Sequence, residues 1–126
     1  MSKKNVKTMR LLIAVIKESL IQDLLTALIE LDVRGATLIN TQGMGRTLVS
    51  EFPIFAGLMN DWGKSKPYNK TVFALVDDDK IIDKLHRLLK DIDIDFTQPD
   101  TGVMFTIPVS RALGTNIDYE EENDEM

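Results

Sequence analysis

The sequence has 126 residues, of which 44% are hydrophobic, so it is long enough for one domain with a single core. It contains no cysteine, which excludes a disulfide framework, a thiolate metal site and a cysteine nucleophile. The formal net charge is −5, but six acids lie within the last nine residues, and without them 15 basic residues face 14 acidic ones. A nearly neutral body lacks the broad basic surface of a protein that binds nucleic acid.

Neither a membrane span nor a signal peptide is expected. The longest apolar run, Leu11 to Ile16, is far too short to cross a bilayer. Basic residues precede this run, as in a signal peptide, but no small-residue cleavage site follows it. We therefore expect a cytoplasmic protein in a reducing compartment, without direct membrane insertion.

The first half of the chain predicts a strand, a helix and a second strand. The continuous apolar run from Arg10 to Lys17 is bounded by charges and typical of a central strand. Ser19 stands at the N-cap position of an amphipathic helix that ends near Asp32. Its apolar positions recur at helical spacing: Leu20, Leu24, Leu25, Leu28, Ile29 and Leu31. β-branched residues then predict a strand over 36–41.

A long loop or insertion is expected between this strand and the next. From Gly43 to Asn69 the chain carries too many helix and strand breakers for one long regular element. They are Gly43, Gly45, Pro53, Gly57, Gly63 and Pro67.

The second half predicts a strand, a helix and a closing strand. Residues 71–76 form the strand, and three aspartates at 77–79 can cap the following helix and favour its positive end. The apolar stripe of that helix is Ile81, Ile82, Leu85, Leu88 and Leu89. A turn-rich segment over 91–101 leads to a strand over 102–109, with Pro108 near its end.

This order of elements predicts an α+β fold, a ferredoxin-like βαββαβ sandwich with a long insertion between strands 2 and 3. We expect one domain over residues 1–114 and an acidic, disordered tail over 115–126. Two helices cover only one face of a four-stranded sheet. A dimer or trimer that covers the other face is therefore expected.

Motifs in both halves resemble the PII signalling proteins, the nitrogen regulatory protein P-II superfamily. In the first half they are the segments 12–17 and 24–37, followed by Gly43-Met44-Gly45-Arg46. In the second half Val76-Asp77-Asp78-Asp79 leads into a helix, and the stretch 101–111 closes the domain. The resemblance covers about residues 10–113 and identifies the chain as a divergent PII-like protein.

The resemblance implies a nucleotide site between subunits. In the family a Gly-x-Gly-Arg turn opens the T-loop, a long segment that touches partner proteins, and Gly43, Gly45 and Arg46 match it. Glycines let the backbone approach a phosphate closely, and an arginine adds charge-assisted hydrogen bonds. Taken alone, such a motif is more often an ordinary turn. Thr37 matches the family threonine at the adenine end of the cleft.

The segment 98–102 has the position of the family's B-loop, which wraps the phosphates of a nucleotide bound by the neighbouring subunit. Without the resemblance it would equally be a plain turn before an edge strand. The predicted nucleotide-binding residues are Thr37, Gly43, Met44, Gly45, Arg46, Thr47, Gln98, Pro99, Asp100, Thr101, Gly102 and Arg111.

Three departures from the family pattern bear on the ligand. Val103 stands where the family carries a lysine, and only Arg111 supplies a positive charge near the end of the last strand. Fewer cations weaken triphosphate binding, so ADP or AMP is expected to bind about as well as ATP. Thr47 replaces the glutamine that the family uses for a dicarboxylic metabolite. Nitrogen and carbon sensing of the usual kind is therefore not expected.

The segment that corresponds to the T-loop is unusually apolar. It contains Phe52, Ile54, Phe55, Leu58, Met59 and Trp62 at a spacing that suits a short helix, with Pro53 in its first turn. Two explanations remain open. The helix packs within its own trimer, or it forms a docking surface in which Phe52, Phe55 and Trp62 contact a partner and Trp62 is the anchor.

The sequence thus predicts a homotrimeric signal-transduction protein that binds ADP or ATP between subunits. By resemblance, its partner would be a transporter or a metabolic enzyme. An enzyme is not expected, because His86 is the single histidine and no nucleophile–base spacing, P-loop or metal cluster is present. The alternative is a structural or metabolite-binding trimer, CutA-like or ACT-like, without nucleotide sensing. The insertion after the second strand and the Gly43 to Arg46 turn favour the PII-like reading.

Overall fold

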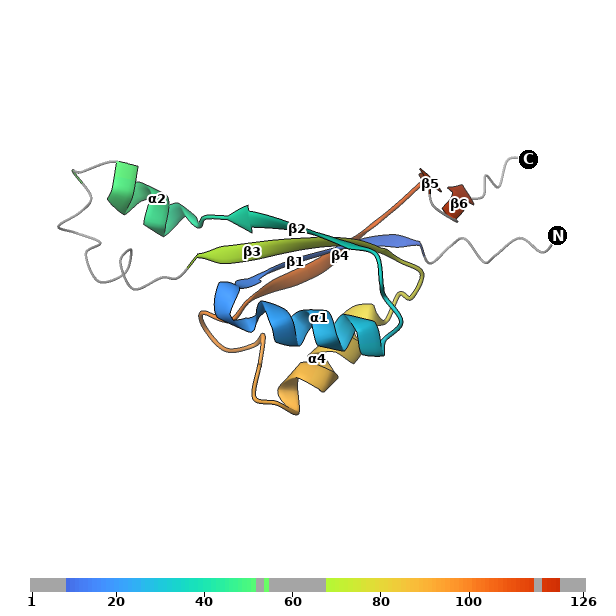
Figure 1. Cartoon of the computed structure of the whole chain (residues 1–126), viewed down its shortest axis with the longest axis horizontal. Helices are drawn as coiled ribbons and strands as arrows, with labels where there is room; N and C mark the ends of the chain where they lie inside the picture. The colour runs from blue at the N-terminus through green and yellow to red at the C-terminus, as the bar shows by residue number, and fades with distance from the viewer. Residues whose placement is uncertain (1–8, 52–53, 55–67, 115–116, 121–126) are drawn as a thin grey trace.

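A computed structural model describes residues 9–51, 54, 68–114 and 117–120 of the chain. Its strands are β1 (Arg10–Lys17), β2 (Ala36–Thr41), β3 (Asn69–Val76), β4 (Gly102–Pro108), β5 (Arg111–Gly114) and β6 (Ile117–Glu120). Its helices are the 3₁₀ turn η2 (Glu18–Leu20), α1 (Ile21–Glu30), α2 (Met44–Glu51) and α4 (Ile81–Lys90). The predicted order of strand, helix, strand, strand, helix, strand is confirmed. The long connection between β2 and β3 is present as well (Figure 1).

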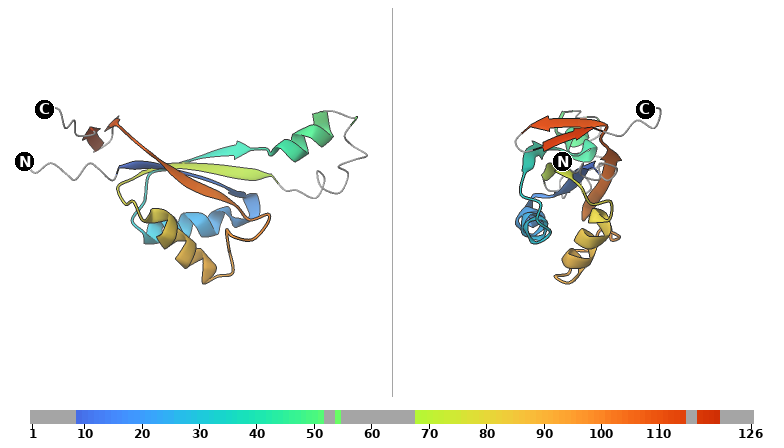
Figure 2. Two further views of the ribbon diagram at one scale, coloured as in Figure 1. Left: turned by 180° about the vertical axis from the view of Figure 1, so that it is seen from behind. Right: turned by 90° about the vertical axis from the view of Figure 1, so that its right-hand side faces the viewer.

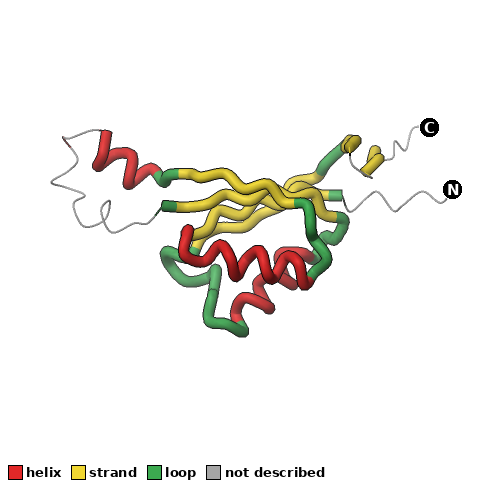
Figure 3. The backbone as a smooth tube through the Cα atoms, in the orientation of Figure 1, coloured by secondary structure: helices red, strands yellow, loops and turns green. Residues whose placement is uncertain are grey.

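Four strands form one antiparallel sheet in the order β2-β3-β1-β4. The apolar strand β1 lies inside the sheet and pairs with β3 on one side and β4 on the other. Ile16 pairs with Gly102 at one end of β1, and Arg10 pairs with Pro108 at the other. Because β3 also pairs with β2, the residues that leave β2 and enter β3 lie at the Ile16 end (Figure 3).

Both long helices pack on the same face of the sheet (Figures 1 and 2). Alternate residues of β1 and β3 point into this layer, as the two-residue period of a strand requires. α1 and α4 each contribute residues one helical turn apart, as their predicted stripes require. The buried core comprises Leu12, Ala14, Ile16, Leu24, Ala27, Leu28, Val72, Ala74, Val76, Ile81, Leu85, Leu89 and Ile94.

The opposite face of the sheet carries apolar side chains that no other described element covers. On β4, Val103, Phe105 and Ile107 are 51%, 43% and 44% exposed. In register with them on β1 are Val15, Ile13 and Leu11, which are only half-buried. Thirteen apolar residues are buried in the core, whereas the apolar side chains of this second face stay partly exposed among the residues that the structure describes. It is called the outer face below.

Both helices of the core layer end in the same hydrogen-bonded motif. After α1 the N–H of Val33 donates to the carbonyl of Leu28, and after α4 the N–H of Ile94 donates to that of Leu89. The residues before them, Asp32 and Asp93, have φ angles of 66° and 67°. This pattern is the Schellman motif, in which an aspartate takes the left-handed position more often held by glycine. It explains why α1 stops where the sequence predicts.

The structure corrects two predictions about helix starts. Ser19 is not an N-cap, because it lies inside η2, which is held by the N–H of Glu18 donating to the carbonyl of Tyr68 at 2.9 Å. The Gly43 to Arg46 segment is not an open turn, because α2 begins at Met44. Gly43 acts as its N-cap, and its carbonyl accepts the N–H of Thr47 at 3.1 Å.

Four residues of the segment expected to be a disordered tail have a regular structure. Ile117–Glu120 forms β6, which pairs with β5 in an antiparallel hairpin. An apolar or aromatic residue alternates with an acid in this segment, which is the two-residue period of a strand. The hairpin lies at the end of the sheet opposite to α2 (Figure 1).

No helix in the described ranges is long and apolar enough to span a bilayer.

Candidate functional site

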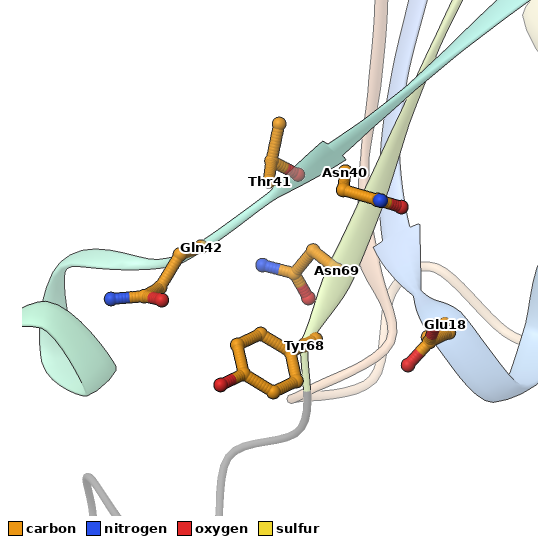
Figure 4. Close-up of a pocket in the computed structure, with 6 residues that line it drawn as sticks. All are labelled: Glu18, Asn40, Thr41, Gln42, Tyr68 and Asn69. Carbon is orange, nitrogen blue, oxygen red and sulfur yellow. The ribbon is translucent and has the colours of Figure 1, made fainter.

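A polar pocket of about 350 Å³ lies where the chain leaves β2 and returns to β3. It is lined by Glu18, Asn40, Thr41, Gln42, Tyr68 and Asn69 (Figure 4). Antiparallel pairing of Thr41 with Asn69 brings the two ends of the long connection together here. Glu18 comes from the turn that follows β1. It is called the stem pocket below, because it lies between the two stems of the 42–69 connection.

Hydrogen bonds fix the walls of the stem pocket. Lys70 donates to the Asn40 side chain at 2.6 Å and lies 3.9 Å from the Glu18 carboxylate. The hydroxyls of Thr41 and Thr71 are 2.9 Å apart. Of the six lining residues only Glu18 is charged, and three are carboxamides, which both donate and accept hydrogen bonds. The pocket itself therefore suits a polar ligand group without a large excess of negative charge.

The predicted glycine turn lies directly beside the stem pocket. Gln42 donates to the Thr47 hydroxyl at 2.9 Å, and this hydroxyl donates to the Gly43 carbonyl at 3.1 Å. A Cβ added to Gly43 would lie 3.7 Å from the Asn69 amide nitrogen, which is ordinary contact. These bonds tie the first turn of α2 to the end of β2. A ligand that contacts the stem pocket would thus also affect how α2 leaves the sheet.

The predicted 98–102 loop lies at the same end of the sheet but on the other edge. Gly102 opens β4 and pairs with Ile16, whereas Gly43 follows the edge strand β2. Two strands separate these edges, so the backbones are about 14 Å apart at a spacing of roughly 4.8 Å per strand. Asp100 has a φ of 68°, which forms the tight turn before β4.

Thr37 lies in a different hollow, of about 540 Å³, on the outer face. The hollow is lined by Leu11, Arg34, Gly35, Thr37, Phe73, Ala74 and Leu75. Thr37 pairs with Phe73 and is six residues before Gly43, or about 20 Å along an extended chain. Arg34 forms an ion pair with Asp32 at 3.0 Å, but both side chains are well exposed, so this pair contributes little stability.

Arg111 opens β5, beyond the end of β4 that pairs with Arg10. The predicted nucleotide-binding residues therefore occupy four places in one chain. Gly43 to Thr47 and Gln98 to Gly102 lie on opposite edges at the Ile16 end of the sheet, Thr37 lies on β2 level with Ile13, and Arg111 lies beyond the far end of β4. Neither the stem pocket nor the hollow at Thr37 joins these groups. The predicted contact residues Phe52, Phe55 and Trp62 lie outside the described residues, and so does the side chain of Arg46.

Sequence reasoning missed most of the stem pocket. Asn40, Gln42, Tyr68 and Asn69 have no motif spacing, and only the register of β2 with β3 brings them together. One signal was available, since polar residues stand at both ends of the long connection. Arg34 and Gly35, which directly precede β2, were a similar signal for the hollow at Thr37.

Two carboxylates in the described ranges have lowered pKa values. The Lys84 ammonium, 2.6 Å away, lowers the pKa of Asp78, and the N–H of Lys80 adds a second hydrogen bond at 2.9 Å. The hydroxyl and N–H of Thr97 lower the pKa of Asp95. Asp78 thus holds the first turn of α4, although the N-cap residue itself is Lys80. Among the described residues no three histidine, cysteine or acidic side chains are grouped as a metal site.

Solved structures of other proteins share this fold. PII from Arabidopsis thaliana bound to citrate matches with 15% identity and a TM-score of 0.51, over 82% of this chain and 78% of that one. A functionally unknown protein from Pediococcus pentosaceus matches with 17% identity and a TM-score of 0.52, over 86% and 99%. At these identities the likeness shows the fold. No curated protein matches the sequence.

The family is shown by the sequence itself. A model of the family described as nitrogen regulatory protein P-II matches residues 9–117, which include all strands from β1 to β5, both core helices and α2. The ferredoxin-like sheet and the long connection after β2 agree with it. The chain therefore belongs to the nitrogen regulatory protein P-II family of signal-transduction proteins.

Proposed function

We propose that this protein binds an adenine nucleotide, ADP or ATP, in clefts between the subunits of a homotrimer and passes the signal to a partner protein. The observation that carries the proposal is that the predicted site residues lie apart in one chain, on opposite edges of its sheet. Thr37 lies in a hollow on the outer face, whereas Gly43 to Thr47 and Gln98 to Gly102 lie at the end of the sheet where Ile16 pairs with Gly102. These groups lie apart in one copy, and we propose that a neighbouring copy completes the site.

The outer face supports assembly. Its apolar residues on β4 are about half exposed and line up with apolar residues on β1. Burying such a face is favourable by about 25 cal/mol per Å² of apolar surface. In this proposal the hollow at Thr37 of one subunit lies beside the glycine turn or the 98–102 loop of the next subunit in a symmetric trimer.

The expected ligand follows from the charges. Gln98, Pro99, Asp100 and Thr101 supply no positive charge, and Val103 adds none. Arg46 and Arg111 are then the cations proposed to face the phosphates. Each charge-assisted hydrogen bond contributes about 1.5–3 kcal/mol, so losing the usual lysine favours ADP over a ligand with more negative charge. The adenine would lie near Thr37, whose hydroxyl can hydrogen-bond the base.

The proposed mechanism is a population shift. Nucleotide bound at Gly43 to Thr47 would stabilise one orientation of α2 through the bonds from Gln42 and Thr47. This orientation sets what the 47–69 segment presents to a partner, with Phe52, Phe55 and Trp62 as contacts. By resemblance the partner is a transporter or a metabolic enzyme. The protein would act in the cytoplasm as a regulator and carry out no reaction itself.

Isothermal titration with ATP, ADP and AMP tests the proposal. The expected result is saturable binding at one site per subunit, weakened about tenfold or more in Arg46→Ala by the loss of charged hydrogen bonds. Arg87→Ala is the matched control, because Arg87 is exposed on α4 and is not one of the predicted nucleotide-binding residues. Absence of binding to all three nucleotides would contradict the proposal. Equal affinities of the two variants would contradict the role of the glycine turn.

A further inference from the structure

A second cleft, of about 250 Å³, lies between α4 and β4 and is separate from the stem pocket and from the hollow at Thr37. It is lined by Ile82, Asp83, His86, Phe96, Thr97, Gly102, Val103 and Met104. Ile82, Phe96 and Met104 pack against the core and form an apolar floor. Asp83, His86 and Thr97 supply the polar groups. The cleft is smaller than the roughly 300–1,000 Å³ of pockets for drug-sized ligands, so it suits a small molecule.

The polar groups of this cleft favour a ligand that donates hydrogen bonds. The Nδ1 atom of His86 is shielded from solvent and has no hydrogen-bond partner among the described residues. Because this nitrogen is shielded, and an imidazole nitrogen can either donate or accept, the acceptors that a ligand in the cleft can reach are Asp83 and Thr97. Asp83 lies one helical turn before His86 and supplies a carboxylate, which accepts hydrogen bonds and favours positive charge.

The Thr97 hydroxyl is also set up as an acceptor. It donates its proton to Asp95 at 2.6 Å, and the N–H of Thr97 donates to the same oxygen at 2.9 Å. The hydroxyl lone pairs therefore remain for a donor in the cleft. The described side chains that line the cleft include one carboxylate and no lysine or arginine, which disfavours an anionic ligand.

We propose that the cleft between α4 and β4 binds a small primary ammonium compound with an apolar body. The ammonium group donates to the Asp83 carboxylate and to the Thr97 hydroxyl, and the body lies on Ile82, Phe96 and Met104. Such a ligand contacts Thr97 and Gly102, which flank the 98–101 segment, and so restrains this loop. The effect on nucleotide affinity rests on the proposed function, whereas binding in the cleft does not.

Benzylammonium is a suitable probe, because it joins a small apolar ring to a primary ammonium group. Amide NMR spectra of the full-length protein without nucleotide are recorded during the titration. We expect saturable shifts confined to residues 82–86 and 96–104, at a dissociation constant of about 1 mM for a ligand of this size. Benzyl alcohol and benzoate have the same ring without the positive charge and are expected to bind more weakly.

Asp83→Asn and Asp91→Asn form a matched pair, since both remove one exposed carboxylate of the α4 region but only Asp83 lines the cleft. Asp83→Asn should weaken benzylammonium binding about threefold to tenfold, and Asp91→Asn should leave it within about twofold. Absence of saturable shifts up to about 10 mM, equal binding of benzoate, or equal affinities of the two variants would overturn the proposal. The titration contains no nucleotide, so its outcome is independent of nucleotide binding.

Discussion

Gly102, the first residue of β4, has no room for a side chain. An added Cβ would lie 2.3 Å from the carbonyl oxygen of Val15, 3.1 Å from the Cα of Ile16 and 3.2 Å from the Phe96 ring. Its φ of +150° is also one that residues with a side chain rarely adopt. Gly102→Ala should therefore strongly destabilise the fold.

The size of the effect follows from these distances. A carbon–oxygen contact is normally about 3.3 Å or longer, so the overlap with Val15 is about 1 Å. Val15 belongs to β1, which is held between two neighbouring strands and cannot easily move away. Overpacking of this kind costs about 1–3 kcal/mol, and an unfavourable backbone conformation costs about 1–3 kcal/mol more. We expect the free energy of unfolding to fall by about 3–5 kcal/mol.

Two other glycines distinguish the effect of steric overlap from the effect of the unfavourable φ angle. Gly114 has a φ of +152° but nothing within 4 Å of an added Cβ, and Gly35 has neither problem. Urea unfolding followed by circular dichroism, at one fixed protein concentration, measures all three alanine variants. The loss should be largest for Gly102→Ala and smallest, within about 0.5 kcal/mol of zero, for Gly35→Ala. A Gly102→Ala loss as small as that of Gly35→Ala would refute the reasoning.

Two further predictions concern α4. Asp93→Gly should raise the free energy of unfolding, measured with urea, by about 0.5–1 kcal/mol, because glycine adopts the left-handed conformation with less strain. Asp91 has a helical φ of −63°, so Asp91→Gly should instead lower the free energy of unfolding. The reverse order would contradict the Schellman assignment. The pKa of Asp78 is lowered, mainly by its hydrogen bond with Lys84. The ionised carboxylate therefore stabilises the fold at pH values above the pKa of Asp78 in the unfolded chain, and this stability is lost as the pH falls below about 4. Urea unfolding from pH 6 to 3 should therefore depend less on pH in Asp78→Asn, and an unchanged pH dependence would show that this bond is unimportant.

Most of the core could be predicted from the sequence, because its periodicities are local. The apolar run of Arg10–Lys17 gave the bounds of β1, and the spacing of Leu85 and Leu89 gave the buried side of α4. These signals are strong, since one buried face repeats every two residues in a strand and every three or four in a helix.

The two wrong predictions about helix starts arose where a residue type suits more than one local structure. Glycine marks a turn, but it is also tolerated at an N-cap, and α2 uses Gly43 in that way. Ser19 is a good N-cap residue, but the chain turns through η2 first because Glu18 bonds to Tyr68 across the sheet end. Such long-range contacts do not appear in a local pattern.

The candidate sites could be predicted only in part. The family resemblance led to Thr37 and the glycine turn, because those motifs are continuous in sequence. The stem pocket depends on the pairing of Thr41 with Asn69, and the α4–β4 cleft depends on how Phe96 and Gly102 pack beside His86. Strand register and helix packing join residues that are far apart in sequence, so residue spacing alone could not reveal either site.

The functional proposal depends most on the nucleotide site forming between subunits. The direct test is calorimetric titration of ADP into Phe105→Glu, with its mass determined by sedimentation, beside Ile92→Glu as a control. Phe105 lies on the outer face, and Ile92 is an exposed apolar residue after α4. We predict that Phe105→Glu is monomeric and binds ADP at least about tenfold more weakly, while Ile92→Glu keeps wild-type mass and affinity. A monomeric Phe105→Glu protein with wild-type affinity for ADP would contradict the account, as would a variant that remains trimeric.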